Sequence, residues 1–440
     1  MKNKIKTSAL LTIIAEWLEQ KELPPLIPRH GAGISPETLK RILAIVGPRR
    51  AGKTYYMYQL IGALLQNGIC SKEDILFIDF EDYRLGQFSA DQVDDLFAGF
   101  QHLAGRLPRF LFFDEVQQLA DWQRVLRTLH NRGCFKIIVS GSNSKLLGGE
   151  IATELRGRYE DVLMLPFSFG EYLHYKEISV TPASMYTAAR GSIMAAFDDY
   201  IRHGGFPEVA MAGNEMERRR LLQTYFKTIF HRDILDRYHI KARHILDALM
   251  GHVLETYSGI FSISAFEKRL KANGLPGSKR TIANYLQHLE EAFFIIVNEK
   301  FSFSARRRIM NPKKIYLSDS GFAGLGRPFT ENRGQLLENV VVTELLRREA
   351  EMYYFKNRNE CDVIVKQGLR PLQAIQVCWE LNERNGKREI AGLAEACRAL
   401  NLHSGLILTY AQEEEREDNR LKISVVPVWK WLLEGSGFKG

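Results

Sequence analysis

Short apolar runs alternate with longer amphipathic segments in the first third of the chain. Four of these runs have the length and composition of buried strands. They lie at 43–46 (LAIV), 75–80 (ILFIDF), 110–113 (FLFF) and 136–140 (KIIVS). The intervening segments repeat apolar residues at helical spacing, as DWQRVLRTLH does at 121–130. Strands that alternate with helices in this way predict an α/β fold, with a parallel sheet covered by helices on both faces.

The same patterns divide the rest of the chain. The first 20 residues favour an amphipathic helix over a signal peptide, because Glu16 and Glu19 interrupt their apolar run. The acidic run EEERED at 413–418 is typical of a solvated loop. We expect an N-terminal helix and linker at 1–35, the strand–helix core at 36–170, a mostly helical part at 171–255, a compact unit at 256–315 and a second α/β domain at 316–440.

Composition narrows the class of protein. The chain has 440 residues, 45% hydrophobic and 25% charged, as in ordinary globular proteins and unlike disordered chains. Its five cysteines are scattered and form no CxxC pair, which argues against a zinc site or a disulfide framework. No apolar run approaches the roughly 20 residues that span a bilayer, so we expect a cytoplasmic protein without a membrane partner. The net charge of +8 permits a polyanionic partner without requiring one.

A glycine-rich motif follows the first expected strand. Residues 47–54, GPRRAGKT, match the phosphate-loop pattern GxxxxGK(S/T), and a helical segment follows at once. In such a loop the backbone amides point at phosphate groups, the lysine contacts the outer phosphates and the threonine binds Mg²⁺. We therefore expect ATP to contact Gly47, Pro48, Arg49, Arg50, Ala51, Gly52, Lys53 and Thr54. The alternative is a fortuitous glycine turn.

Two adjacent carboxylates follow the strand FLFF. Asp114 and Glu115 emerge from a very apolar run about sixty residues beyond Lys53. Burying charge is costly without a partner, so a purely structural role explains this pair poorly. The functional interpretation assigns Asp114 to Mg²⁺ and makes Glu115 the base that activates the attacking water. The alternative is an acidic pair that caps the next helix.

Polar residues after the fourth strand and before residue 160 are further candidates. Asn143, or else Ser142, is placed to contact the γ-phosphate or the attacking water, with simple turn chemistry as the alternative. Arg158, which follows Arg156, is a candidate finger that stabilises charge on a neighbouring subunit's phosphate, which implies a homo-oligomer. Arg158 fits equally well as a partner of a nearby surface carboxylate.

With these motifs placed, the chain resembles a known family. The strings GSNSKLL, LRGRYED, LPFSFGEYL and GGFPEV, together with 225–238 and 316–345, carry the resemblance. They resemble bacterial and archaeal AAA-type ATPases that carry a C-terminal restriction-endonuclease-like domain. The resemblance covers nearly the whole chain. It implies a P-loop NTPase core of AAA type that binds and hydrolyses ATP, followed by a helical lid, a winged helix and a nuclease-like α/β domain.

Residues 262–296 have the pattern of a helix–turn–helix. A short helix leads through a turn with two glycines and a proline to a second helix that starts near Ser278, and the following residues suggest a β-wing. Between 262 and 314, eleven Lys or Arg face four Glu, a local net charge of +7 that favours contact with a polyanion such as double-stranded DNA. The alternative is a protein-docking module. The candidate nucleic-acid contacts are Lys279, Arg280 and Asn284 on the second helix and Arg306, Arg307 and Arg308 at the tip of the wing.

The C-terminal region resembles the PD-(D/E)xK nuclease core. That chemistry uses carboxylates to hold Mg²⁺ and a lysine to position water. Glu338 and Asp362 match the first two acidic positions, but the Glu-x-Lys strand carries Gln376 and Cys378 instead. Nothing in the spacing favours Lys356 or Lys387 as a replacement. We therefore expect a degenerate nuclease fold that is retained for binding.

The sequence predicts an ATP-driven switch or remodelling protein of AAA type that acts on nucleic acid or a macromolecular complex, with ATP and Mg²⁺ as cofactors. Two alternatives remain open. One is a signalling or defence scaffold in which nucleotide locks a closed state and the basic module binds a protein. The other is an ATP-regulated nuclease.

Overall fold

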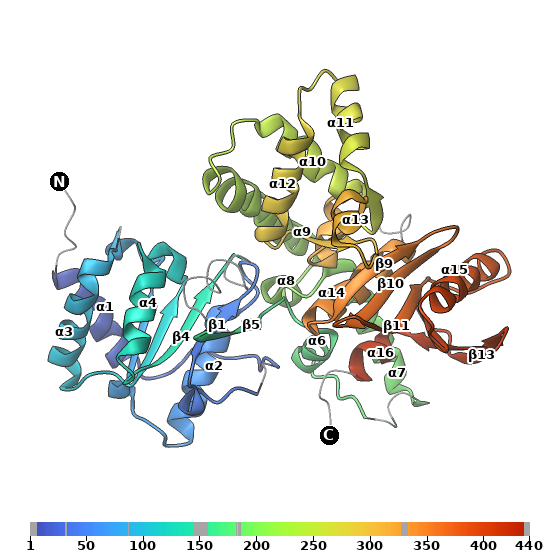
Figure 1. Ribbon diagram of the computed structural model, residues 1–440. Coiled ribbons are helices and arrows are strands. Elements are labelled where there is room, and N and C mark those ends of the chain that lie inside the picture. Colours follow the sequence, from blue (N-terminus) through green and yellow to red (C-terminus); the bar gives the residue numbers. More distant parts are fainter. Residues whose placement is uncertain are drawn as a thin grey trace. The chain divides into compact units, whose positions relative to one another are not determined.

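The computed structural model describes residues 7–30, 33–86, 88–143, 157–181, 183, 186–326 and 333–434. The chain divides into two compact units, Met1–Leu165 and Pro166–Gly440 (Figure 1). The finer division into five segments stays a prediction. In this described part of the chain, no helix has both the length and the apolar character needed to cross a membrane.

The first unit is built on a five-stranded parallel sheet with strand order β2-β3-β4-β1-β5. The strands are β1 (Ile42–Val46), β2 (Ile75–Asp79), β3 (Phe110–Asp114), β4 (Lys136–Gly141) and β5 (Tyr159–Leu163). Every residue of β1 and β3 is buried, because both faces of the sheet are covered. The predicted parallel α/β core is confirmed, and the four expected strands lie within one residue of their predicted bounds.

Helices complete this unit. They are α1 (Thr7–Glu19), α2 (Lys53–Gln66), α3 (Val93–Ala104) and α4 (Trp122–Asn131). α1 and α2 contribute buried side chains to one core with the sheet, and the indole N–H of Trp17 donates to the carbonyl of Ile75 at 2.7 Å. The expected amphipathic first helix is thus α1, with Leu10 and Ile14 buried.

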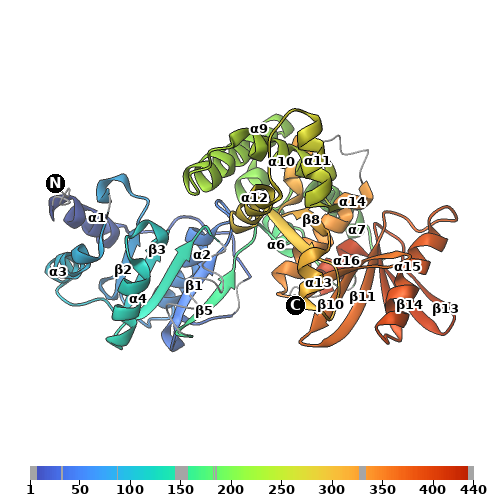
Figure 2. The ribbon, with the colours of Figure 1, turned by 45° about the horizontal axis from the view of Figure 1, so that its top comes forward.

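The second unit begins with helices, as the pattern predicts (Figure 2). They are α6 (Phe169–Tyr175), α7 (Ala189–His203), α8 (Pro207–Met211), α9 (Glu215–Thr228), a π-helical stretch (Ile229–Asp236) and α10 (Arg243–Thr256). α7 ends just before Gly204, whose φ of 79° is left-handed, and α8 starts at a proline. These two residues explain the break in the helical pattern.

A three-stranded antiparallel sheet follows, with order β6-β8-β7. Its elements are β6 (Gly259–Phe261), α11 (Ile263–Ala272), α12 (Lys279–Glu291), β7 (Ile295–Glu299), α13 (Ala305–Met310) and β8 (Lys313–Leu317). The two expected helices are present, and Ser278 caps the second by accepting the backbone N–H of Thr281 at 3.1 Å. The two strands of the predicted wing, β7 and β8, pair antiparallel, but the connection between them is helical and not a simple β-tip. Arg306, Arg307 and Arg308 lie in the short helix α13, because Ser304 provides a helix cap and arginine is a good helix former.

The last part of the second unit is a mixed six-stranded sheet with order β13-β14-β12-β11-β10-β9. Its elements are α14 (Arg333–Arg347), β9 (Glu351–Lys356), β10 (Glu360–Gln367), β11 (Arg370–Val377), α15 (Gly386–Ala399), β12 (Ser404–Thr409), β13 (Glu414–Asp418), β14 (Leu421–Pro427) and α16 (Val428–Glu434). The acidic run at 413–418 is not a loop. It forms the edge strand β13, where charged side chains remain in water and discourage further strand pairing.

Three of the strings that carry the family resemblance meet in the core of the second unit. The carboxylate of buried Asp319 accepts the backbone N–H of Gly205 at 2.8 Å and of Gly321 at 2.9 Å. The N–H of Phe167 donates to the carbonyl of Gly205 at 2.7 Å. A Cβ on Gly204 would lie 1.7 Å from Asp319 Oδ1, so only glycine fits there. These three strings therefore pack on one another.

Candidate functional site

The glycine-rich motif lies between β1 and α2, where the sequence predicts it. Gly52 precedes α2 with a φ of 96°, which favours glycine, and the N-terminus of this 14-residue helix is exposed to the loop. A Cβ on Gly47 would lie 2.0 Å from the carbonyl oxygen of Met164, so glycine alone permits the first bend of the loop. The loop therefore has the backbone shape needed to surround phosphate groups.

Arg29, in the proline-rich segment that the sequence suggests is a linker, supports this loop. Its buried guanidinium donates to the carbonyl of Ala51 within the loop and to the carbonyl of Leu165 at 2.7 Å. Its backbone N–H and carbonyl pair with the side-chain amide of Gln59 on α2 at 2.8 and 3.0 Å. Sequence reasoning missed this arginine, since no local pattern marks a contact across 22 or 136 residues.

The acidic end of β3 meets the phosphate loop. β4 lies between β1 and β3 in the sheet, so the carboxyl ends of these strands lie at one edge. The hydroxyl of Thr54 donates to Asp114 Oδ2 at 2.6 Å, and the hydroxyl of Ser140 donates to the other oxygen of the same carboxylate. The Nζ of Lys53 lies 3.5 Å from Glu115 Oε1. The two motifs that the sequence assigns to one nucleotide are therefore in contact.

Glu115 is held in an unusual backbone conformation. Its φ of 48° is left-handed, which is rare for residues other than glycine and is concentrated at functional sites. Its N–H donates to the Ser140 hydroxyl at 3.0 Å, and its carboxylate accepts from the side-chain amide of Gln117. These contacts turn the side chain toward Lys53 and the phosphate loop.

The two carboxyl groups have pKa values that move in opposite directions. Burial, and then the charge of Glu115, raise the pKa of Asp114. Burial also opposes ionisation of Glu115, but the positive charges of Lys53 and Arg49 outweigh it and lower the pKa of Glu115. Neighbouring carboxyl groups with divergent pKa values are typical of sites where each has its own role. The lowered pKa keeps Glu115 ionised at neutral pH.

A third carboxylate at this edge was missed by the sequence reasoning. Asp79 ends β2 directly opposite Asp114 on β3. Loss of hydration raises the pKa of Asp79 to about 6, and the charge of Asp114 contributes. The same signal that marks Asp114, a carboxylate at the carboxyl end of an apolar strand, was present in ILFIDF.

The remaining candidates of this unit lie at opposite edges of the parallel sheet: Ser142 and Asn143 at the phosphate-loop edge and Arg158 at the other. Buried Ser142 accepts from the amide of Gln117 at 3.4 Å, and Asn143 follows it beyond the end of β4. Arg158 precedes β5, and its carbonyl accepts the N–H of Ile42 at the start of β1 at 2.9 Å. It therefore lies at the sheet edge opposite the phosphate loop, since the strands are parallel. Arg156 lies outside the described residues.

The donor set fits a nucleotide with a magnesium ion. Mg²⁺ prefers oxygen ligands, and the hydroxyl of Thr54 and the carboxylate of Asp114 converge at this point. The ammonium of Lys53 already lies within the loop, where it donates to the carbonyls of Gly47 and Pro48 at 3.2 and 3.0 Å. Thr54 and Asp114 are the residues that would hold the metal. Within the described ranges no group of three His, Cys, Asp or Glu could hold one, so phosphate and water would complete its shell.

The candidate nucleic-acid contacts lie around the three-stranded sheet. Lys279 and Arg280 are exposed at the start of α12, and Arg306 and Arg307 are exposed on α13. Arg308 is half-buried and donates to the carbonyl of Ser302 at 2.8 Å. The first four side chains are therefore accessible to a partner.

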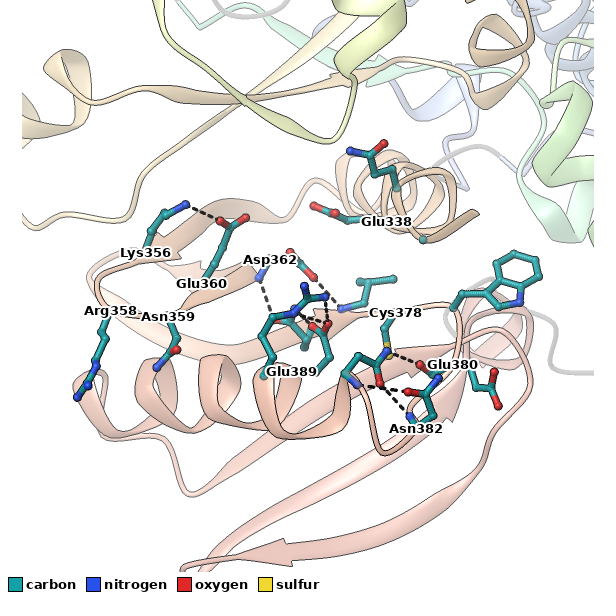
Figure 3. A pocket seen from close by; sticks show the side chains of 17 residues that line it. Glu338, Lys356, Arg358, Asn359, Glu360, Asp362, Cys378, Glu380, Asn382 and Glu389 are labelled. Carbon is teal, nitrogen blue, oxygen red and sulfur yellow. Dashed lines mark hydrogen bonds and ion pairs between the residues drawn. The ribbon is translucent and has the colours of Figure 1, made fainter. Parts of the chain in front are cut away.

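The C-terminal candidates gather at a cavity of about 740 Å³ (Figure 3). Glu338 on α14, Asp362 on β10 and Gln376 on β11 all line it. The amide of Gln376 donates to Glu389 Oε2 at 2.6 Å, and its oxygen accepts the N–H of Asp362 at 3.3 Å. Figure 3 shows Glu338 on its helix above the strand that carries Asp362. The structure thus brings together all three positions that the nuclease resemblance indicates.

A lysine that the sequence reasoning did not consider reaches this cluster. The Nζ of Lys314, on β8, lies 2.8 Å from Glu338 Oε1, 2.8 Å from Glu360 Oε1 and 2.8 Å from Asp362 Oδ1. Of the two lysines considered, Lys356 pairs with the outer oxygen of Glu360 at 3.0 Å, and Lys387 is exposed on α15.

The parallel sheet, the phosphate loop and the acidic end of β3 define an AAA-type P-loop ATPase fold. A family model described as "AAA domain" matches residues 39–173. Two models described as domains of unknown function, DUF8612 and DUF4143, match residues 194–330 and 333–431.

Relatives match over most of the chain. The uncharacterized protein MJ1544 of Methanocaldococcus jannaschii is 33% identical over 404 residues, covering 89% of this chain and 88% of that protein. An uncharacterized protein of Haemophilus influenzae is 29% identical over 402 residues, covering 89% and 94%. The crystal structure of Cdc6p from Pyrobaculum aerophilum covers 78% of this chain and 97% of its own, at 12% identity and a TM-score of 0.25, a distant likeness. The chain belongs to the family of AAA-type ATPases that includes protein MJ1544.

Proposed function

We propose that this protein is an ATP-binding, magnesium-dependent ATPase that works as a switch or remodelling machine on nucleic acid. The observation that carries the proposal is the contact between the phosphate loop and the end of β3. Thr54 bonds to Asp114 at 2.6 Å and Lys53 lies 3.5 Å from Glu115. A nucleotide whose phosphates enter the loop is thereby within reach of an ionised carboxylate.

Each residue has a distinct task in this proposal. Lys53 exchanges its contacts with loop carbonyls and Glu115 for the outer phosphates. Glu115, whose pKa is lowered by Lys53 and Arg49 against the effect of burial, then orients water and accepts its proton. Mg²⁺, when bound, neutralises charge on the phosphate oxygens. Asn143 or Ser142 positions the water or the γ-phosphate.

Arg158 is proposed to act between subunits. It lies at the edge of its own sheet opposite the phosphate loop, so it does not reach the phosphates of its own subunit. In a homo-oligomer, an arginine at that edge is available to the nucleotide of a neighbouring chain, where it would stabilise developing charge.

The target is proposed to be double-stranded DNA, bound by residues 256–315 as a winged helix. The support is the order of helices and antiparallel strands in this segment and the exposure of Lys279, Arg280, Arg306 and Arg307. The local charge supports it too: it is +6 when buried Lys314 is left out, with ten Lys or Arg against four Glu. In that geometry α12 enters the major groove with its N-terminal end at the bases or phosphates.

The test is the rate of ATP hydrolysis with and without duplex DNA, with Glu115→Gln as the inactive control. We expect DNA to raise the rate and its binding to weaken steeply with salt. Replacing Lys279 and Arg280 by Ala is expected to lower the salt slope by about one for each phosphate that the variant no longer neutralises. Replacing exposed Lys21 and Lys40 of the first unit is the charge-matched control.

Other outcomes favour the alternatives. Negligible turnover with a protein partner whose binding is insensitive to salt would support a nucleotide-locked scaffold. Cleavage of plasmid in Mg²⁺, abolished in Glu338→Ala, would support a nuclease.

We propose that residues 316–440 are a degenerate nuclease-like domain retained for binding. The support is the order α14, β9, β10, β11, α15, β12, with the first strands antiparallel and β12 parallel to β11. Glu338 and Asp362 occupy the helix and strand positions of the expected acidic pair, and Cys378 stands where a lysine is required.

A further inference from the structure

The carboxylate cluster of the second unit already contains a cation from its own chain. The ammonium of Lys314 has three N–H donors and lies 2.8 Å from each of three carboxylate oxygens. The lysine is 2% exposed, so water does not compete for it. Tyr316 adds a hydroxyl that donates to Glu338 Oε1 at 2.7 Å. All three N–H donors of the ammonium therefore have carboxylate acceptors within the protein.

Local structure holds every member of this cluster in place. Lys314 and Tyr316 are two residues apart on β8, so both side chains leave the same face of that strand. Glu360 and Asp362 are likewise two apart on β10, and Glu338 lies within α14. The second oxygen of Asp362 accepts the N–H of Val377 on the neighbouring strand at 2.9 Å. The ammonium is thus enclosed by strands of two different sheets and by a helix.

The nuclease resemblance implies a divalent cation at these carboxylates, and the arrangement does not fit one. A metal that bound the same three oxygens would have to occupy the position of Lys314 Nζ. Mg²⁺ requires oxygens at about 2.0–2.1 Å and Ca²⁺ at about 2.3–2.6 Å, both shorter than the 2.8 Å spacing set by the ammonium. Across the described segments of the chain, no cluster of three His, Cys, Asp or Glu is arranged to hold a metal ion.

The Glu-x-Lys positions that metal-dependent cleavage needs carry Gln376 and Cys378 instead. Gln376 supplies a neutral amide, and this amide is already engaged with Glu389 and with the N–H of Asp362. Cys378 lies in the position expected for lysine, and burial raises the pKa of its thiol to about 12. A thiol that stays protonated carries no positive charge with which to position water.

We infer that Lys314 is a built-in substitute for the divalent cation: it closes the carboxylate site of the second unit to metal, and its removal exposes a calcium-binding site made of Glu338, Glu360 and Asp362. This inference goes beyond the proposed ATPase function and does not depend on it. It leaves the adjoining cavity available for binding without metal-dependent cleavage.

The test is calorimetric titration of Ca²⁺ into the full-length, nucleotide-free protein. We expect the wild type to show no saturable binding at this site. Lys314→Met is expected to bind one Ca²⁺ at least about tenfold more tightly than the wild type, with a dissociation constant in the range of protein oxygen sites. Lys356→Met is the matched control. Lys356 also pairs with Glu360 but its side chain is 47% exposed, so this variant is expected to behave as the wild type. Adding Asp362→Asn to Lys314→Met should abolish the gain.

Two results would overturn the inference. One is Ca²⁺ binding by the wild type that Asp362→Asn removes. The other is a folded Lys314→Met protein, with intact ATP binding, that gains no Ca²⁺ site. If Lys314→Met does not fold, Lys314→Met with Glu338→Gln reduces the unpaired charge. Its melting temperature is then expected to rise with Ca²⁺, and a melting temperature indifferent to Ca²⁺ would equally overturn the inference.

Discussion

Each unit of this protein contains a buried lysine that pairs with carboxylate, and the two lysines are held in opposite ways. In the first unit, Lys53 lies 3.5 Å from Glu115 and donates to the loop carbonyls of Gly47 and Pro48. In the second unit, Lys314 lies 2.8 Å from each of three carboxylates.

The two lysines differ in the strength of the internal hydrogen bonds that must break before an external ligand can bind the ammonium. Neutral carbonyls and one distant carboxylate are weak partners, so an incoming phosphate competes well for Lys53. Three charged hydrogen bonds in a buried site are strong partners, and nothing outside the protein replaces them for Lys314. A buried lysine that pairs with carboxylate is therefore a ligand-binding group in one unit and an internal cation in the other.

The largest expected effect concerns Glu115. Glu115→Gln removes the base but keeps the shape of the side chain, so ATP hydrolysis is expected to fall by about 10²–10⁴-fold with ATP binding retained. Single-turnover hydrolysis and equilibrium binding measure the two quantities. Glu73→Gln, an exposed position away from the loop, is the control. Normal hydrolysis by the Glu115→Gln protein would show that another group is the base.

The next effect is on stability, and it tests whether Lys314 is an internal cation. Lys314→Met leaves three carboxylates without their buried partner, so the free energy of unfolding is expected to fall by about 3–5 kcal/mol. Lys356→Met breaks an exposed pair and is expected to cost at most about 1 kcal/mol. Urea unfolding followed by circular dichroism measures both. Equal destabilisation of the two variants would show that Lys314 is not a stabilising internal cation.

Removing the lysine of the first unit is expected to weaken ATP binding rather than to destabilise the fold. Lys53→Ala removes a charged donor to phosphate, which is worth about 3 kcal/mol at most, so affinity for ATP is expected to fall by roughly 100-fold. The unfolding free energy should change much less than in Lys314→Met, because Lys53 has weaker internal partners. Fluorescent-nucleotide titration measures the affinity, with exposed Lys40→Ala as the control. Unchanged affinity in Lys53→Ala would refute the phosphate-loop assignment.

The smallest effect is the pH dependence that Asp79 introduces. Its pKa is raised to about 6, so it gains a proton, and the site loses a negative charge, as the pH falls through 6. The Mg²⁺ concentration needed for half-maximal ATPase rate is therefore expected to rise about threefold between pH 7 and pH 5. Asp79→Asn should remove this step. A step of the same size in Asp79→Asn would assign it to another group.

Much of the first unit was predictable because its signals are local. The four strands are apolar runs, and the phosphate loop is a contiguous motif at a strand–helix junction. Asp114 was predictable because charge at the end of a buried strand is costly without a function. The same reasoning applied to ILFIDF would have found Asp79.

Other features were not predictable from neighbouring residues. The strands on either side of Arg306–Arg308 pair as a wing, but the cap at Ser304 makes the connection between them helical. The acidic run at 413–418 has no apolar alternation, and it became a strand only because β14 offered it an edge.

The sequence by itself determined the class of the first unit and the positions of Lys53, Thr54, Asp114 and Glu115, because periodicity and glycine motifs act over a few residues. Only the tertiary structure decided that Arg29 supports the phosphate loop and that Lys314 pairs with Glu338, Glu360 and Asp362. These buried contacts join residues 22 to 136 positions apart in the chain, and no local pattern records that packing.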